Sequence, residues 1–172
     1  MRKNPRDKIQ YIVANNVIAF TEKILSEYGL MQPPNEGLVY WGGVRSGFDV
    51  IVNAAVAPNT KSSSFRIETS PESNVQLIKI LTEHNIVHIG QVHSHPSDWV
   101  EHYLGDDEWA AFKIKGLLSI VVPEYCMNGF LPFKNCGVHR FTGKRFIRLS
   151  DSYILKHFKI EVSKNTNLID LR

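Results

Sequence analysis

Segment 117–122, Leu-Leu-Ser-Ile-Val-Val, constrains the fold of this 172-residue chain more than any other feature. Its β-branched and aliphatic residues favour a strand, and the run is far shorter than the ~18 apolar residues of a membrane span. It also lacks the alternation of a half-exposed strand, which predicts a strand that is buried on both faces. Such a strand requires covering layers on either side, so we expect a central sheet packed against helices.

Two helices are predicted by capping residues and apolar spacing. The first begins at Asn15 or Asn16, whose side chain can cap the helix, and it stops at Gly29. The second begins at Thr69-Ser70-Pro71-Glu72, which offers hydroxyl caps, a proline in the first turn and a glutamate three residues after the threonine. This helix is expected to run to about residue 84, and the residues expected to face inward are Val75, Ile78 and Leu81.

Strands and hairpins account for most of the remaining chain. Single strands are predicted at residues 9–13 and 86–93. Strands at 38–41 and 48–56 flank a glycine-rich connection, with Trp41 and Phe48 in the hairpin core, and strands at 138–141 and 144–149 flank Thr142-Gly143.

The expected connections complete one α/β domain. They are a polar loop at 58–64, a short helix at 106–113 and a helical tail after Ser150. The order of elements predicts a sandwich that spans residues 1–172, with its core at about residues 8–149 and a C-terminal tail.

Composition agrees with one soluble domain. Hydrophobic residues make up 43% of the chain and charged residues 22%. The net charge of +3 is small and the basic residues are scattered along the sequence, so neither nucleic acid nor a membrane is an expected partner. Cys126 and Cys136 lack CxxC spacing, and we expect two reduced thiols in a cytoplasmic protein.

The motif His93-Ser94-His95-Pro96 carries the chemistry. Residues i and i+2 of a strand point to the same face, so both imidazoles can bind one ion. The chain leaves the strand at the proline and reaches Asp106, whose carboxylate can complete a two-histidine, one-carboxylate zinc site. Zinc makes hydroxide available near neutral pH, and Glu36, at the start of an upstream strand, is the candidate general base.

These assignments have competitors within the sequence. Two surface histidines on a strand are the alternative interpretation of the HxH pattern taken alone. Asp98 and Asp107 compete with Asp106 as the carboxylate ligand. His88 has the opposite strand parity and is not expected at the same ion, and His84 lies near a helix C-terminus, where a charged histidine is favourable without any function.

Glu36, His93-Ser94-His95-Pro96 and Asp106 together resemble the JAMM motif of the JAB/MPN metalloproteases. In that family a glutamate on an early strand precedes HxH, seven residues, a serine, two residues and an aspartate. The order of predicted elements is similar over about residues 8–149. The resemblance implies a JAB/MPN (cytidine-deaminase-like) sandwich, with a mixed sheet flanked by helices. It implies His93, His95 and Asp106 as zinc ligands, favouring Asp106 over its competitors, and Glu36 as the general base.

One position departs from the family pattern. Tyr103 stands where the family has a serine that is thought to stabilise the developing oxyanion. Its phenol can donate in place of the serine, or its larger side chain can point away from the metal. Trp99 and His102, in the same loop, are candidates for substrate contact. The alternatives are a packed loop anchor for Trp99 and an exposed loop residue for His102.

Family members hydrolyse isopeptide or peptide bonds after the C-terminal glycine of ubiquitin-like proteins. The motif is similar to that of stand-alone bacterial JAB proteins, some of which are encoded beside E1-like and E2-like enzymes in antiphage operons. We therefore expect a cytoplasmic, Zn2+-dependent isopeptidase that matures a ubiquitin-like protein or removes it from conjugates. The substrate tail is expected to bind extended along a sheet edge, in a groove walled by segment 58–66 or 126–136. The alternatives are a non-catalytic MPN scaffold and a JAB-fold hydrolase of a small amide or peptide.

Overall fold

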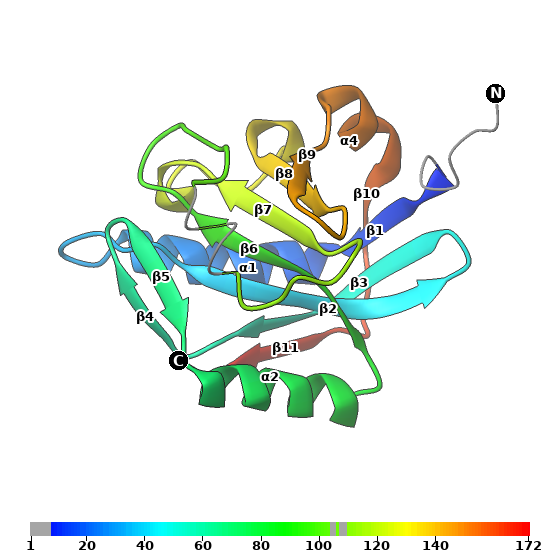
Figure 1. Ribbon diagram of the computed structural model, residues 1–172, viewed down its shortest axis with the longest axis horizontal. Coiled ribbons are helices and arrows are strands. Elements are labelled where there is room, and N and C mark those ends of the chain that lie inside the picture. The colour runs from blue at the N-terminus through cyan, green and yellow to red at the C-terminus, as the bar shows by residue number, and fades with distance from the viewer. Residues whose placement is uncertain (1–7, 104–105, 107–109) are drawn as a thin grey trace.

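The computed structural model describes residues 8–103, 106 and 110–172, and it has a mixed α/β fold (Figure 1). Within these residues, nine strands form one sheet in the order β10-β1-β3-β2-β6-β7-β8-β9, with β11 also paired to β3. Strands β4 and β5 form a separate two-stranded hairpin. Helix α1 packs on one face of the large sheet and α2 on the other, so the expected layered architecture is confirmed.

The elements follow one another along the chain as β1 (Gln10–Ala14), α1 (Asn15–Gly29), β2 (Leu38–Ser46), β3 (Asp49–Ala57), β4 (Thr60–Ser63), β5 (Arg66–Thr69), α2 (Pro71–Glu83), β6 (Val87–Ser94), β7 (Leu118–Val122), the 3-10 turns η2 (Glu124–Cys126) and η3 (Phe133–Asn135), β8 (Gly137–Phe141), β9 (Phe146–Arg148), α4 (Asp151–His157), β10 (Phe158–Glu161) and β11 (Asn167–Asp170).

Strands β6 and β7 lie in the interior of the sheet, where each is paired on both sides. All five residues of β7 are buried, as the apolar run predicts. Strand β6 pairs parallel with β7 and antiparallel with β2. Side chains along β2 alternate between the two cores: Val39 and Trp41 pack on the α1 side, whereas Leu38 and Tyr40 pack on the α2 side.

The β2–β3 hairpin is confirmed, but two of its glycines do not lie in the connection. Gly42 and Gly43 lie inside β2, where the pairing register shifts. A Cβ on Gly43 would lie 1.9 Å from the carbonyl oxygen of Ile51, so this close approach of the strands requires glycine. Gly47 supplies the turn, with a φ of +61°.

Three apolar residues that we expected in the core are about half exposed: Phe48, Val75 and Ile78. Phe48 lies in the hairpin turn itself, outside the core that encloses Trp41. Helix α2 is capped by Ser70 rather than Thr69, and it buries a stripe with a spacing of four residues, formed by Ser73, Leu77 and Leu81. Only Leu81 of the predicted inward face is therefore correct, because packing on the sheet decides which side of the helix is covered.

The prediction of a polar loop at residues 58–64 is wrong in part. Strand β4 pairs with β5 and turns at Ser64 and Phe65. The sequence of β4, Thr-Lys-Ser-Ser, has no apolar residue that would indicate a strand. Its start is fixed by tertiary contact, since the hydroxyls of Tyr28 and Thr60 lie 2.8 Å apart.

The chain after Leu149 contributes to the main sheet. Helix α4 confirms only the start of the expected helical tail. Beyond it, β10 pairs parallel with β1, and β11 pairs parallel with β3. Asn15 and Asn16, expected as helix caps, bind this returning chain instead: Asn16 Nδ2 donates to the Ser163 carbonyl, and Asn15 Oδ1 accepts from the Ser163 amide. The N-cap position of α1 is Ala14, whose side chain caps nothing.

The prediction of a short helix at residues 106–113 is also wrong in part. Residues 110–113 are irregular, and residues 107–109 lie outside the described residues. No helix in the described part of the chain is both long and apolar enough to cross a membrane. Cys126 and Cys136 are buried free thiols, and burial raises the pKa of each to about 12.

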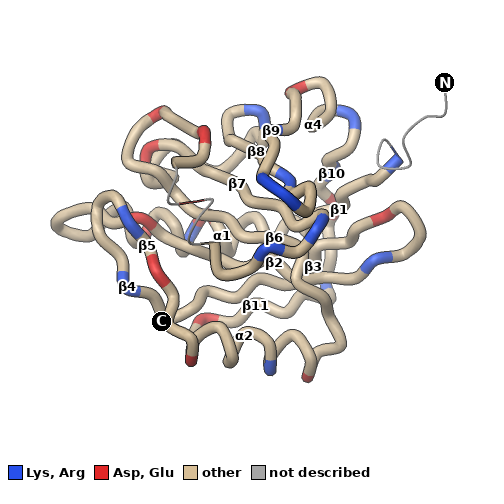
Figure 2. Tube along the Cα trace, viewed as in Figure 1, with Lys and Arg blue, Asp and Glu red and all other residues tan. Residues whose placement is uncertain are grey.

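Charged residues of both signs are spread over the surface (Figure 2). One group of basic residues is not scattered as the sequence predicted. The side chain of Lys115 lies 3.7 Å from the position of a Cβ on Gly143, next to Lys144 and Arg145 in the β8–β9 turn. Folding therefore gathers cations that are far apart along the chain.

Candidate metal centre

His93 and His95 lie at the carboxyl end of β6 and are 3% and 0% exposed. Strand pairing fixes them, because His93 lies between Leu38 and Val121 and the His95 amide donates to the carbonyl of Val122. Ser94 points the other way, where its Oγ accepts from the amide of Gly37 at 2.9 Å. The period of two along the strand therefore directs both imidazoles to one side.

Three side-chain groups meet with the spacing of neighbouring ligands around one ion. The Nε2 atoms of His93 and His95 are 3.1 Å apart. Asp106 Oδ1 lies 3.5 Å from His93 Nε2, and Asp106 Oδ2 lies 3.3 Å from His95 Nε2. Tetrahedral bonds of about 2.05 Å would place adjacent ligand atoms about 3.3 Å apart. This group can therefore hold a metal ion.

The outer nitrogen of His95 orients its ring. His95 Nδ1 lies 2.9 Å from the carbonyl oxygen of Trp99, which can only accept a hydrogen bond. A proton on Nδ1 leaves Nε2 facing Asp106. In the metal-free site Nε2 also carries a proton that it donates to Asp106, and loss of that proton would free the Nε2 lone pair for a metal. Burial lowers the pKa of His95, but the hydrogen bond and charge of Asp106 outweigh burial and raise it.

Asp106 is held in place by the backbone of the same loop. Its Oδ2 accepts from the amide of Tyr103 at 2.7 Å. Burial alone would raise the pKa of this carboxyl, but the hydrogen bonds from His93 and His95 hold it well below its usual range. Of the competing carboxylates, Asp98 is exposed and outside this group, and Asp107 lies outside the described residues.

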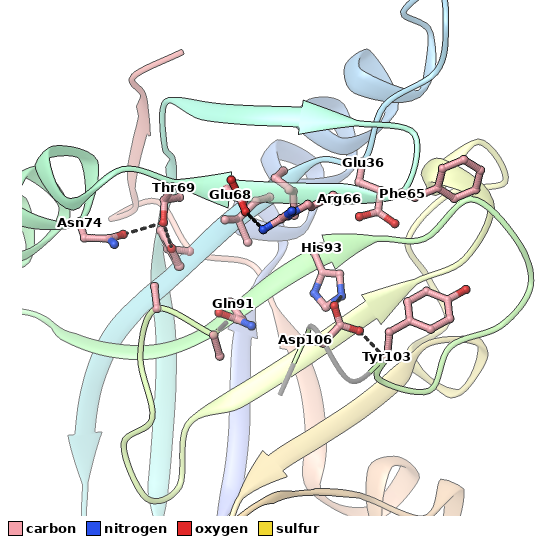
Figure 3. Close-up of a pocket in the computed structure, with 15 residues that line it drawn as sticks. Glu36, Phe65, Arg66, Glu68, Thr69, Asn74, Gln91, His93, Tyr103 and Asp106 are labelled. Atoms are coloured by element: carbon pink, nitrogen blue, oxygen red, sulfur yellow. Dashed lines mark hydrogen bonds and ion pairs between the residues drawn. The ribbon is translucent and has the colours of Figure 1, made fainter. Parts of the chain in front are cut away.

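Glu36 lies just before β2, with its backbone amide bound to the Ser63 carbonyl at 2.9 Å. Its side chain is 4% exposed and points toward His93 and Asp106 (Figure 3). Within the described residues, Oε1 has no hydrogen-bond partner. Burial raises the pKa of Glu36 to about 7; the charge of His95 opposes this rise and the charge of Asp106 adds to it. Burying a carboxylate that lacks a full set of hydrogen-bond partners costs free energy of folding. A pKa near neutral pH suits a group that exchanges protons during catalysis.

The other candidate residues lie near this group but differ in which of their atoms approach it. The Tyr103 ring stacks on His95 with centroids 4.6 Å apart, and its hydroxyl points away from Asp106 (Figure 3). This geometry fits the second of the two orientations that we considered for Tyr103. The indole of Trp99 is 53% exposed, and its carbonyl rather than its ring reaches the site. His102 is partly buried, with Nε2 3.0 Å from Ser119 Oγ.

Two further histidines lie apart from the metal ligands. His88 packs edge-on against Tyr40 and Phe112. Burial lowers the pKa of His88 to about 4, and its hydrogen bond to the Gly90 carbonyl opposes the effect. His88 is therefore a neutral, partly buried residue outside the ligand group. The parity argument is wrong, because a register shift in the β2–β6 pairing puts His88 opposite Gly42 on the α2 side, the side on which Leu38 pairs with His93. His84 follows the last turn of α2 and is exposed.

A cavity of about 660 Å³ opens beside the ligands. One wall is β5 and its turn, with Phe65, Arg66 and Ile67, and the facing wall includes Tyr103 and Asp106 (Figure 3). Of the two segments that we expected to wall a groove, 58–66 therefore contributes its last two residues. Segment 126–136 does not line this cavity.

Sequence spacing did not indicate several polar neighbours of the site. The His139 ring packs at a tilt against His102, with centroids 4.0 Å apart. His139 Nε2 lies 3.3 Å from Glu101, which also pairs with Arg148. Tyr125 reaches the turn of the β4–β5 hairpin. These residues come from separate elements, so no local pattern connects them.

The comparisons with known proteins give information on the fold alone. No protein-family model matches the chain, and no curated protein does. The solution structure of protein DSY2949 from Desulfitobacterium hafniense is similar, with a TM-score of 0.64 over 90% of this chain and 94% of that one. Their sequences are 17% identical, so the likeness supports a shared mixed α/β fold.

Proposed function

We propose that this chain is a Zn2+-dependent hydrolase of the JAB/MPN type, which cleaves a peptide or isopeptide bond after the C-terminus of a ubiquitin-like protein. One observation carries the proposal: the ligand-spaced group of His93, His95 and Asp106 faces the buried Glu36, which has a pKa of about 7. Ligands and a proton-transfer group in one cavity form the minimal set for hydrolysis of an amide.

The donor set suits zinc. Two neutral imidazoles and one carboxylate form a common catalytic zinc set. When bound, zinc would supply Lewis acidity toward the scissile carbonyl and the attacking water. Glu36 would accept a proton from that water and transfer it to the leaving amine, so that the carboxylate is regenerated after each turnover. Tyr103 would shield His95 with its ring, since its hydroxyl is directed elsewhere.

The groove suits an extended chain end. Among the described strands, β5 pairs only with β4, so its other edge has no strand partner there. Its residues from Arg66 to Thr69 line the cavity. A substrate tail can pair with the other edge while its last residues approach the ligands. Ala110 and Ala111 line the same cavity, and such small side chains leave a passage suited to glycine.

The biological setting follows from the motif resemblance. The substrate would be a ubiquitin-like protein or its conjugate, formed by E1-like and E2-like enzymes in the cytoplasm. Removal or maturation of such a modifier would belong to a bacterial antiviral conjugation system.

Hydrolysis of a fusion between a ubiquitin-like protein and a reporter tests the function. We expect the zinc-loaded wild type to cleave after the modifier. We expect Glu36→Gln to keep zinc and lose about 10²-fold or more in kcat, because general acid–base transfer is lost. Glu83→Gln, at the exposed end of α2, is the matched control and should retain activity. Equal activity of Glu36→Gln and wild type would overturn the mechanism.

The remaining outcomes separate the alternatives. Folded protein that binds no zinc and cleaves nothing would indicate a scaffold subunit. Cleavage of small amides without cleavage of modifier fusions would indicate a small-substrate hydrolase.

A further inference from the structure

Tyr125 lies at the junction of three segments that surround the candidate site. It lies in the turn η2, three residues after the end of β7. Its amide donates to the His95 carbonyl at 2.8 Å, so its backbone is attached to a candidate metal ligand. Its phenol donates to the carbonyl of Ser64 at 3.0 Å, at the tip of the β4–β5 hairpin.

The backbone of this turn is unusual. Glu124, Tyr125 and Cys126 are consecutive non-glycine residues with φ of 50°, 53° and 62°. Left-handed residues of this kind are uncommon and persist where surrounding contacts hold them. This turn lets Tyr125 direct its amide toward His95 while its side chain reaches Ser64.

The end of α1 leaves space for this turn. A Cβ on Gly29 would lie 2.8 Å from the Cβ of Tyr125 and 2.9 Å from its carbonyl oxygen. Gly29 was predicted only as a helix stop, and the close approach of Tyr125 is a second reason for glycine there. The turn is therefore held between a metal ligand and a helix.

The hairpin that Tyr125 reaches is attached to the rest of the protein by side-chain and loop contacts rather than by strand pairing. Strands β4 and β5 pair with each other and form no sheet with the nine-stranded one. Near the tip, Ser64 Oγ donates to the Pro34 carbonyl at 2.8 Å, and Ser63 accepts from the amide of Glu36. Two adjacent hairpin residues thus make these contacts: Ser64 binds Tyr125 and Pro34, and Ser63 binds Glu36.

We propose that Tyr125 is a positioning residue of the groove, whose phenol fixes the hairpin tip over the candidate metal ligands and thereby sets the groove width. Figure 3 shows Phe65 and Arg66, next to this tip, on the side of the cavity opposite Asp106 and Tyr103. Partial burial raises the pKa of Tyr125, as does the charge of Glu36, and the hydrogen bond to Ser64 opposes the rise. The phenol is therefore protonated at neutral pH and acts as a donor. The proposal rests on the proposed function only where a substrate is involved.

Hydrogen exchange tests the hairpin without any substrate. Tyr125→Phe removes one hydrogen bond and keeps the ring. We expect amide exchange in residues 60–69 to accelerate about three- to tenfold, the range that corresponds to loss of one ordinary hydrogen bond. Exchange in β6 and β7 should not change, which distinguishes local loosening from unfolding. Tyr153→Phe is the matched control. It removes the hydrogen bond between the Tyr153 phenol on α4 and the Arg140 guanidinium on β8. Unchanged exchange of the hairpin in Tyr125→Phe would overturn the proposal.

Zinc binding and kinetics give a second readout. We expect Tyr125→Phe to bind zinc within twofold of wild type in chelator competition. With a modifier fusion, we expect KM to rise several-fold and kcat to change less than twofold. A fall in kcat at unchanged KM would instead place the phenol at the reacting atoms and refute a positioning role. If the wild type cleaves no fusion, the proposed function fails, and the exchange result still decides the role of Tyr125.

Discussion

Replacement of Glu36 by glutamine in the metal-free protein tests the electrostatics of the site. Burial raises the pKa of Glu36 from 4.5 to about 7 in the folded protein. In the unfolded chain the carboxyl titrates near its ordinary value. As the pH rises from about 4.5 to 7, the unfolded chain therefore releases a proton that the folded protein retains. The free energy of unfolding falls through this window and stays low above it.

The magnitude follows from the two pKa values. At about 1.4 kcal/mol per pH unit, the full penalty on the ionised Glu36 is about 3 kcal/mol, and about 2.5 kcal/mol of it develops between pH 5 and 8. Because the side chain is 4% exposed, solvent screening reduces this value little. Glutamine does not titrate, so Glu36→Gln should become more stable relative to wild type by about 2.5 kcal/mol over this interval.

Urea unfolding in the presence of a chelator measures the effect. Tryptophan fluorescence at pH 5, 6, 7 and 8 reports the transition, since Trp41 is fully buried. Glu83→Gln, which removes an exposed carboxylate, should show no such trend. A stability difference between Glu36→Gln and wild type that does not change with pH would refute the raised pKa.

Three further experiments test the site and the fold. His95→Ala should lose the bound metal that wild type retains at about one zinc per chain, as measured by elemental analysis of folded protein; a mutant that keeps full occupancy contradicts the ligand assignment. Tyr103→Phe should keep near-wild-type kcat on a cleaved fusion, because the hydroxyl points away from Asp106, and Tyr103→Ala should lower activity by uncovering His95; a large loss in Tyr103→Phe would restore the oxyanion role. Leu77→Ala should destabilise the protein by about 2–5 kcal/mol and Val75→Ala by less than about 1 kcal/mol, since only Leu77 is buried; equal losses in chemical denaturation would contradict the observed face of α2.

Local patterns predicted the features that depend on neighbouring residues. The apolar run of β7 indicated a doubly buried strand, and the structure buries all five of its residues. The period of two along β6 indicated that His93 and His95 share a face, and their Nε2 atoms lie 3.1 Å apart. Proline and hydroxyl residues indicated the start of α2 to within one residue.

Features that depend on distant contacts were missed. Strand β4 contains only polar residues, and it forms because β5 pairs with it and Tyr28 binds its first residue. Strands β10 and β11 find their partners at the other end of the chain. Gly42 and Gly43 indicated a turn by composition, whereas the close approach of Ile51 requires Gly43 within a strand.

The sequence by itself determined which residue types could form a metal site and that two of them share a strand face, because strand periodicity is a local property of the backbone. Only the tertiary structure decided that Asp106 and Glu36 meet those histidines, since no spacing rule fixes the separation of a loop and a distant strand. The raised pKa of Glu36 likewise exists only in the folded protein, because it requires neighbours that exclude water from several sides.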